Sequence, residues 1–134
     1  MENRGLVIVH TGDGKGKTTA ALGMAMRAWG NHLRVLILQF IKGSWKYGDL
    51  ESIKALASIN HQIEIRQGGL GFSQRGNGTE EEHRCAAAEL LQTAMDELQS
   101  NAWDMIILDE FNYAYSFGFI SLDNLEKLLA ARPE

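Results

Sequence analysis

The stretch "HTGDGKGKTTAALGMAMRA", from His10 to Ala28, decides the fold expected for this chain. It follows an unbroken apolar run, Leu6 to Val9, and leads into an alanine-rich segment with helical spacing, which indicates a loop between a strand and a helix. A loop in that position presents consecutive backbone N–H groups at the start of a helix, where unpaired donors and the helix dipole favour an anion. The stretch therefore predicts a phosphate-binding site.

Each residue type in this loop suits a nucleotide. The glycines allow the backbone to curl closely around a phosphate chain, Lys17 can reach its terminal oxygens, and the Thr18 hydroxyl can ligate Mg²⁺. The general pattern G-x-x-x-x-G-K-[ST] is shifted, because Thr11 stands where the first glycine belongs. A glycine-rich turn without a ligand is the weaker alternative, given the flanking strand and helix. The predicted nucleotide-binding residues of the loop are Gly12, Asp13, Gly14, Lys15, Gly16, Lys17, Thr18 and Thr19.

A second apolar run, Met105 to Leu108, ends in the two carboxylates Asp109 and Glu110. P-loop proteins use this arrangement to hold Mg²⁺ opposite the loop threonine, so the predicted metal ligands are Thr18, Asp109 and Glu110. Alone, such a run could also be a strand that ends in a solvated turn. Glu110 would orient or deprotonate water in a hydrolase, or help to position Mg²⁺ in a transfer to another acceptor.

Strand-like and helical segments alternate along the chain, which predicts an α/β fold with parallel strands and helices on both faces of the sheet. We expect a three-layer, P-loop NTPase-like architecture in a single nucleotide-binding domain over residues 1–134. The expected strands are Leu6–Val9, Arg34–Phe40, Ile63–Ile65 and Met105–Leu108.

Composition excludes several classes of protein. The 134 residues carry a formal net charge of −4, which does not favour binding to nucleic acid. No apolar stretch approaches the roughly twenty residues of a membrane span. The single cysteine, Cys85, has no partner for an intramolecular disulfide, so we expect a buried, inert thiol and a cytoplasmic location.

The loops that follow the expected strands are rich in aromatic residues, among them Trp45, Phe72 and the cluster from Tyr113 to Phe119. Ligands of parallel α/β sheets bind at the carboxyl ends of the strands, so these loops should line the site of a second substrate. The cluster could equally pack into the core or a subunit interface. The long glycine-rich loop around Phe72 predicts a lid that contacts a large, partly apolar ligand.

The chain resembles a known family in four motifs: "TGDGKGKTTAA" (Thr11–Ala21), "FIKGSW" (Phe40–Trp45), "GF" (Gly71–Phe72) and "DMIILDE" (Asp104–Glu110). Together they are similar to the P-loop type of ATP:corrinoid adenosyltransferase, over essentially the whole chain. The shifted glycine loop looks like that family's own version of the motif.

The resemblance implies that Co(I) of a reduced corrinoid attacks the ribose 5′ carbon of MgATP and displaces triphosphate. Carried onto this sequence, the loop from Gly12 to Thr19 would hold the triphosphate, Lys17 would neutralise it as a leaving group, and Thr18 with Asp109 or Glu110 would support Mg²⁺. Trp45 and Phe72 would contact the substrates, with Phe72 helping to remove the lower axial ligand of cobalt. An electron-donating reductase and a homodimer are further expectations.

The sequence departs from the family pattern in two places. Gln74 stands where the family often has a tryptophan, and the later sheet strands of relatives are not expected here. Two other functional classes stay open. One is a P-loop ATPase or small-molecule kinase, which would use Glu110 as a base, and the other is a non-catalytic module that binds nucleotide or corrinoid.

Overall fold

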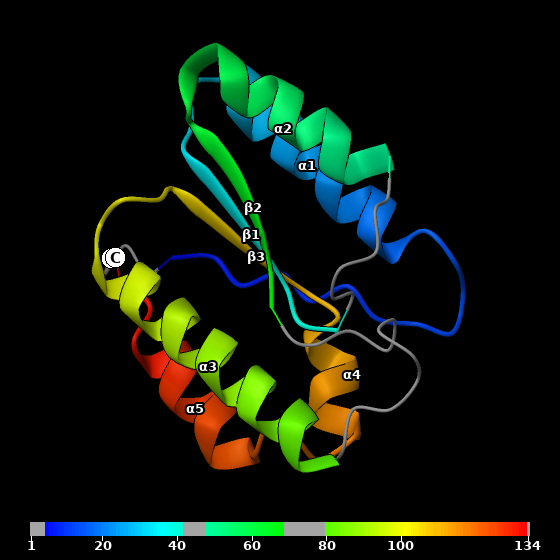
Figure 1. The fold of residues 1–134 in the computed structure, drawn as a ribbon. Helices are drawn as coiled ribbons and strands as arrows, with labels where there is room; N and C mark the ends of the chain where they lie inside the picture. The colour runs from blue at the N-terminus through cyan, green and yellow to red at the C-terminus, as the bar shows by residue number, and fades with distance from the viewer. Residues whose placement is uncertain (1–4, 42–47, 69–79, 134) are drawn as a thin grey trace.

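The computed structural model describes residues 5–41, 48–68 and 80–133. Its centre is a parallel sheet with the strand order β2-β1-β3 (Figure 1). The strands are β1 (Val35–Gln39), β2 (Ile63–Gln67) and β3 (Met105–Asp109). They confirm three of the four strands expected from apolar runs in the sequence.

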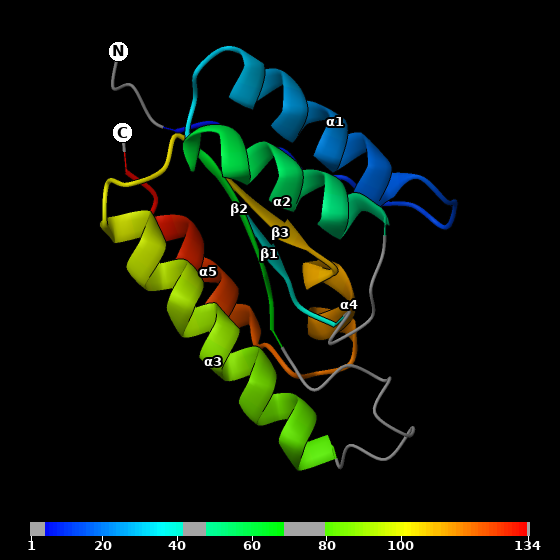
Figure 2. The same ribbon diagram turned by 45° about the horizontal axis from the view of Figure 1, so that its top comes forward.

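Helices cover both faces of this sheet, so the predicted three-layer α/β fold is confirmed. One face is covered by α1 (Lys17–Gly30) and α2 (Gly48–Asn60). The opposite face is covered by α3 (Glu80–Gln99), α4 (Phe111–Ser116) and α5 (Leu122–Ala130). Figure 2 shows α1 and α2 side by side above the strands, with α3 and α5 below.

The central strand β1 is buried along its whole length. Its side chains alternate between the two faces, with Val35 and Ile37 packed in the core under α1 and α2, and Leu36 and Leu38 in the core under α3, α4 and α5. Burial of each such side chain contributes roughly 1.5–3 kcal/mol to folding. The continuous apolar run is thus explained by a strand that has no solvent-facing side.

The expectation of a strand at Leu6–Val9 is wrong for this structure. The segment has no strand pairing, and its side chains are exposed, from 45% at Val7 to 84% at Leu6. Two long hydrogen bonds hold its ends, one from the Gly5 N–H to the Pro133 carbonyl at 3.3 Å and one from Asn112 Nδ2 to the His10 carbonyl at 3.4 Å. An apolar run becomes a buried strand only where other elements cover it, and here all four side chains of the segment stay exposed to solvent over about half of their surface or more.

Cys85 is exposed, so the expectation of a buried thiol is also wrong. The residue lies on α3, whose buried side chains are Ala87, Leu90, Leu91 and Ala94. At 100° per residue, Cys85 falls on the opposite side of the helix from this stripe. Cys85 is therefore exposed because of its position around the helix axis.

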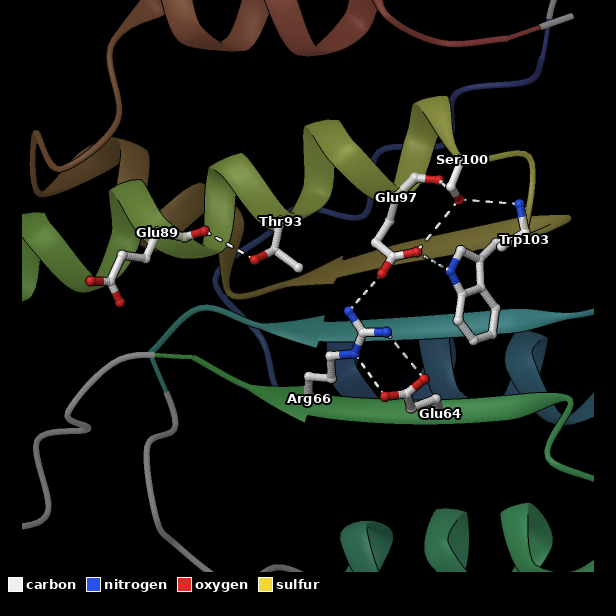
Figure 3. Close-up of polar contacts among 8 residues, drawn as sticks. Glu64, Arg66, Glu89, Thr93, Glu97, Ser100 and Trp103 are labelled. Carbon is white, nitrogen blue, oxygen red and sulfur yellow. Dashed lines mark hydrogen bonds and ion pairs between the residues drawn. The ribbon is translucent and has the colours of Figure 1, made fainter.

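A polar network joins β2 to α3 on the second face of the sheet (Figure 3). The guanidinium of Arg66 pairs with Glu64 at 2.7 Å and with Glu97 at 2.8 Å. Glu97 also accepts a hydrogen bond of 2.6 Å from the indole of Trp103. The hydrogen bond from Arg66, and secondarily that from Trp103, lowers the pKa of Glu97. This charged network anchors α3 to the sheet.

Candidate functional site

The glycine loop leads directly into α1. Two of its glycines have left-handed backbone angles, with φ of 138° at Gly12 and 101° at Gly16, which a side chain would strain. Gly16 is the N-cap and has no side chain to accept from the first N–H groups of α1, and the first helical turn contains no acidic residue. These donors are therefore suited to an external anion.

Lys17 folds back over the loop. Its Nζ donates hydrogen bonds to the carbonyl oxygens of Gly12 at 2.5 Å and Gly14 at 2.7 Å. The loop from Gly12 to Gly16, with Asp13 and Lys15, is exposed, as is Thr19, whereas Lys17 and Thr18 are half-buried. The ammonium group thus lies beside the backbone that a phosphate chain would approach, and a phosphate oxygen could replace either carbonyl.

Thr18 and Asp109 are brought together from opposite ends of the chain. The Thr18 hydroxyl, on the first turn of α1, donates to Asp109 Oδ1 at 3.0 Å, where β3 ends. Hydroxyl and carboxylate oxygens are the hard ligands that Mg²⁺ prefers, so this pair fits the predicted metal. Among the described residues no group of three or more His, Cys, Asp or Glu side chains could hold a metal ion. Mg²⁺ does not need such a group, since one or two carboxylates and the phosphates of a nucleotide commonly suffice.

Glu110 follows Asp109 in an unusual backbone conformation. Its φ of 62° and ψ of 16° are left-handed, and the residue is the N-cap of α4. A non-glycine residue in this region costs of order 1–3 kcal/mol and is often found at functional sites. The sharp turn separates the end of β3 from α4, and the catalytic and metal-binding roles of Glu110 stay predictions.

The aromatic cluster after β3 forms a short helix and a partly exposed row of rings. Within α4, Phe111 is buried and packs edge-on against Phe40 at 5.3 Å. Tyr113 and Phe117, by contrast, are 49% and 51% exposed and stack at 6.2 Å. The row continues from Phe117 to Phe119 and on to the ring of His83 on α3, each step 5.8 Å. Packing into the core is therefore confirmed for Phe111, whereas a substrate-lining role for the exposed rings of Tyr113 and Phe117 stays a prediction.

Trp45, Phe72 and Gln74 lie outside the described residues, and the predictions made for them stay predictions.

Sequence reasoning missed two glutamines at the same edge of the sheet. Gln39 ends β1, is 1% exposed, and donates from Nε2 to Asp109 Oδ2 at 3.2 Å. Gln67 ends β2 and donates to Gln39 Oε1 at 3.0 Å. The available signal was a polar residue that closes an apolar strand, as Asp109 closes β3.

Comparison with known proteins agrees with this arrangement. The profile of the family described as ATP:corrinoid adenosyltransferase BtuR/CobO/CobP matches residues 3–134. The corrinoid adenosyltransferase of Escherichia coli K12 is 36% identical over 133 residues, and so is corrinoid adenosyltransferase CobA of Salmonella typhimurium LT2. A corrinoid adenosyltransferase of Pseudomonas aeruginosa is 30% identical over 132 residues.

These alignments include 98–99% of this chain but 63–65% of each relative, so the chain spans somewhat less than two thirds of their length. The family match extends over nearly every residue, and the loop, Lys17 and the Thr18–Asp109 pair all lie within it. The chain therefore belongs to the BtuR/CobO/CobP family of ATP:corrinoid adenosyltransferases.

Proposed function

We propose that the protein transfers the 5′-deoxyadenosyl group of ATP to the Co(I) centre of a corrinoid and releases triphosphate, in the synthesis or salvage of adenosylcobalamin. One observation carries the proposal: in a member of this family, an uncapped helix N-terminus, the Lys17 ammonium and the Thr18–Asp109 pair meet at the end of β3.

Different residues contact different parts of the triphosphate and its metal ion. The N–H groups at the start of α1 bind its oxygens, and Lys17 exchanges the Gly12 and Gly14 carbonyls for phosphate. Thr18 and Asp109 would hold Mg²⁺, and Glu110 would be a further oxygen ligand. Bound there, Mg²⁺ supplies positive charge that stabilises the departing triphosphate.

Transfer also requires orientation of the two substrates. The Co(I) nucleophile forms a bond to the 5′ carbon as the bond from that carbon to the triphosphate oxygen breaks, and the electron pair leaves with the triphosphate. Holding the two reacting centres in line makes the step effectively unimolecular. The exposed rings of Tyr113 and Phe117 offer an apolar surface for the corrinoid, and we assign Trp45 and Phe72 to the same substrate side.

We extend the proposal to partners and location. An electron-donating reductase would supply the Co(I) state, and a second copy of the chain would cover exposed apolar residues such as those of the Leu6–Val9 segment. A lone cysteine fits the reducing cytoplasm. In the part of the chain that the structure describes, no helix is both long and apolar enough to cross a bilayer. Sedimentation equilibrium tests the dimer, which a monomer at working concentration would contradict.

The products of an anaerobic reaction test the central proposal. The protein is mixed with MgATP and a chemically reduced corrinoid, and we expect a light-sensitive alkylcobalt product with one triphosphate released per corrinoid. ADP, or inorganic phosphate without triphosphate, would instead assign the site to an ATPase or kinase with Glu110 as base. ATP binding without a cobalt–carbon bond would indicate a non-catalytic module.

A further inference from the structure

We propose that Gln39 is a positioning residue that fixes the Asp109 carboxylate for the metal-binding step. The inference rests on the proposed function, because it assumes that Asp109 serves Mg²⁺ bound with ATP. It adds a residue that lies on the sheet rather than in the glycine loop, and that is hydrogen-bonded to the carboxylate that Thr18 also contacts.

Strand register brings three polar side chains level with one another. Gln39 is directly opposite Gln67 on one neighbouring strand and Asp109 on the other. In parallel strands, residues in register point to the same face, which here is the face covered by α1. The side chains therefore form a row across the carboxyl ends of β2, β1 and β3, and the first turn of α1 meets the row at Asp109.

The hydrogen bonds along this row can all form in only one orientation of the Gln39 amide. An ionised carboxylate accepts hydrogen bonds and donates none, so Gln39 must direct its NH₂ group at Asp109. Its carbonyl oxygen then faces Gln67, which must present its own NH₂ group. Donation thus runs from Gln67 to Gln39 to Asp109, while Thr18 donates to the second oxygen of the same carboxylate.

Because Gln39 is buried, its hydrogen bonds hold the Asp109 carboxylate in one orientation. Gln39 is 1% exposed, so its amide does not exchange its partners for bulk water. With Gln39 holding Oδ2 and Thr18 holding Oδ1, the carboxylate plane of Asp109 is fixed at both oxygens. Groups that orient a metal ligand in this way commonly change metal affinity by about 10–100-fold when they are removed.

A merely structural role would have a different signature. If Gln39 only filled space at the end of β1, its loss would weaken the fold and lower all nucleotide binding together. If it positions Asp109, its loss weakens the part of ATP binding that depends on Mg²⁺ and leaves the phosphate contacts of the loop in place.

Calorimetric titration with ATP, once with Mg²⁺ and once with EDTA, separates these roles without any requirement for turnover. The test variant is Gln39→Met, which preserves the length of the side chain and removes both hydrogen bonds. The matched control is Gln62→Met, placed just before β2 at the other end of the sheet, where Oε1 is buried without a partner among the described residues. Thermal unfolding establishes that each variant is folded.

We expect the affinity for ATP measured in the presence of EDTA to stay within about twofold of the wild-type value for both variants. The gain in affinity on adding Mg²⁺ should fall about 10–100-fold in Gln39→Met and stay unchanged in Gln62→Met. Gln39→Glu should lose this gain as well, because it can still accept from Gln67 but cannot donate to Asp109 when ionised. Should Gln39→Met fail to fold, Gln67→Met tests the same row, since it frees the Gln39 oxygen and should reduce the gain in the same direction.

Two results with the variants would overturn the inference: a full Mg²⁺-dependent gain in ATP affinity in folded Gln39 or Gln67 variants, or an equal loss of ATP binding with and without Mg²⁺. A wild-type protein whose ATP affinity does not respond to Mg²⁺ would overturn it too. The outcome is separable from that of the proposed function, because a protein that forms no cobalt–carbon bond can still show the Mg²⁺-dependent difference between Gln39→Met and Gln62→Met.

Discussion

The hydroxyl of Thr18 donates a hydrogen bond of 3.0 Å to Asp109, although 91 positions separate the two residues in the chain. The contact joins the first turn of α1 to the end of β3. It brings the two halves of the expected metal site within hydrogen-bond distance of each other.

Replacing Thr18 with Val is expected to weaken ATP binding at least tenfold in the presence of Mg²⁺, because the variant keeps the shape of the side chain and loses its oxygen. Titration calorimetry measures the effect. Thr93→Val is the control, since the Thr93 hydroxyl bonds to the Glu89 carbonyl of its own helix. Equal affinities for the two variants would contradict the role of Thr18.

Replacing Lys17 with Ala is expected to lower the rate of adenosyl transfer roughly 100- to 1000-fold, because an ammonium group that stabilises the leaving triphosphate is lost. The rate of alkylcobalt formation is the measurement. Lys54→Ala removes the same charge from an exposed position on α2 and should leave the rate unchanged. Undiminished transfer by the Lys17 variant would remove that residue from the site.

Replacing Glu110 with glycine should affect the stability of the fold and the transfer activity in opposite directions. Glycine adopts a φ of 62° without a Cβ penalty, so Glu110→Gly should raise the free energy of unfolding by up to about 1 kcal/mol while adenosyl transfer falls. Glu110→Gln should lower transfer with little change in stability. His32→Gly is the control, because φ there is 65° and the residue is not part of the predicted site. Full activity in Glu110→Gly would show that the carboxylate is dispensable.

The ion pair between Arg34 and Asp104 predicts a pH dependence of stability. Hydrogen bonds from the Arg34 side chain and backbone lower the pKa of Asp104 from 3.8 to about 2. Because the folded pKa is depressed, the stabilisation is complete above pH ~4 and is lost as the pH falls towards about 2. Asp104→Asn should therefore unfold at a temperature roughly 2–4 °C lower at neutral pH, since the pair is partly exposed, and the difference should vanish near pH 2. A pH-independent difference would contradict the ion-pair explanation.

The network at Arg66 should matter more than an exposed pair. Arg66→Met leaves Glu64 and Glu97 without their shared cation, and we expect a loss of about 1–2 kcal/mol in the free energy of unfolding in urea. Arg84→Met removes an exposed i,i+4 pair with Glu80 and should lower the free energy of unfolding by only a few tenths of a kcal/mol. Comparable losses in both variants would argue against the anchoring role.

The sequence predicts most of the sheet because the signal for β1 and β3 is local. An apolar run without alternation indicates a strand covered on both faces, as the structure confirms for Val35–Gln39. The same signal fails at Leu6–Val9, where the side chains are exposed. The pattern records a capacity for burial, whereas pairing and cover depend on neighbouring elements that the run itself does not encode.

The candidate site also has a part that local sequence predicts and a part that it does not. The glycine loop and Lys17 lie within a few residues of one another, so their spacing alone predicts a phosphate site, and the Thr18–Asp109 contact follows from the order of strands and helices. The row formed by Gln39, Gln67 and Asp109 depends on the register between three strands. Register is a tertiary property, and two glutamines at strand ends do not reveal it in a single sequence.

A crystal structure of the protein with Mg²⁺ and a non-reactive ATP analogue tests the central claim most directly. We expect the triphosphate against the N–H groups at the start of α1, with Lys17 Nζ moved from the Gly12 and Gly14 carbonyls to phosphate oxygens and Mg²⁺ beside Thr18 and Asp109. Nucleotide bound in a different part of the molecule, with the glycine loop empty and Lys17 unmoved, would contradict it.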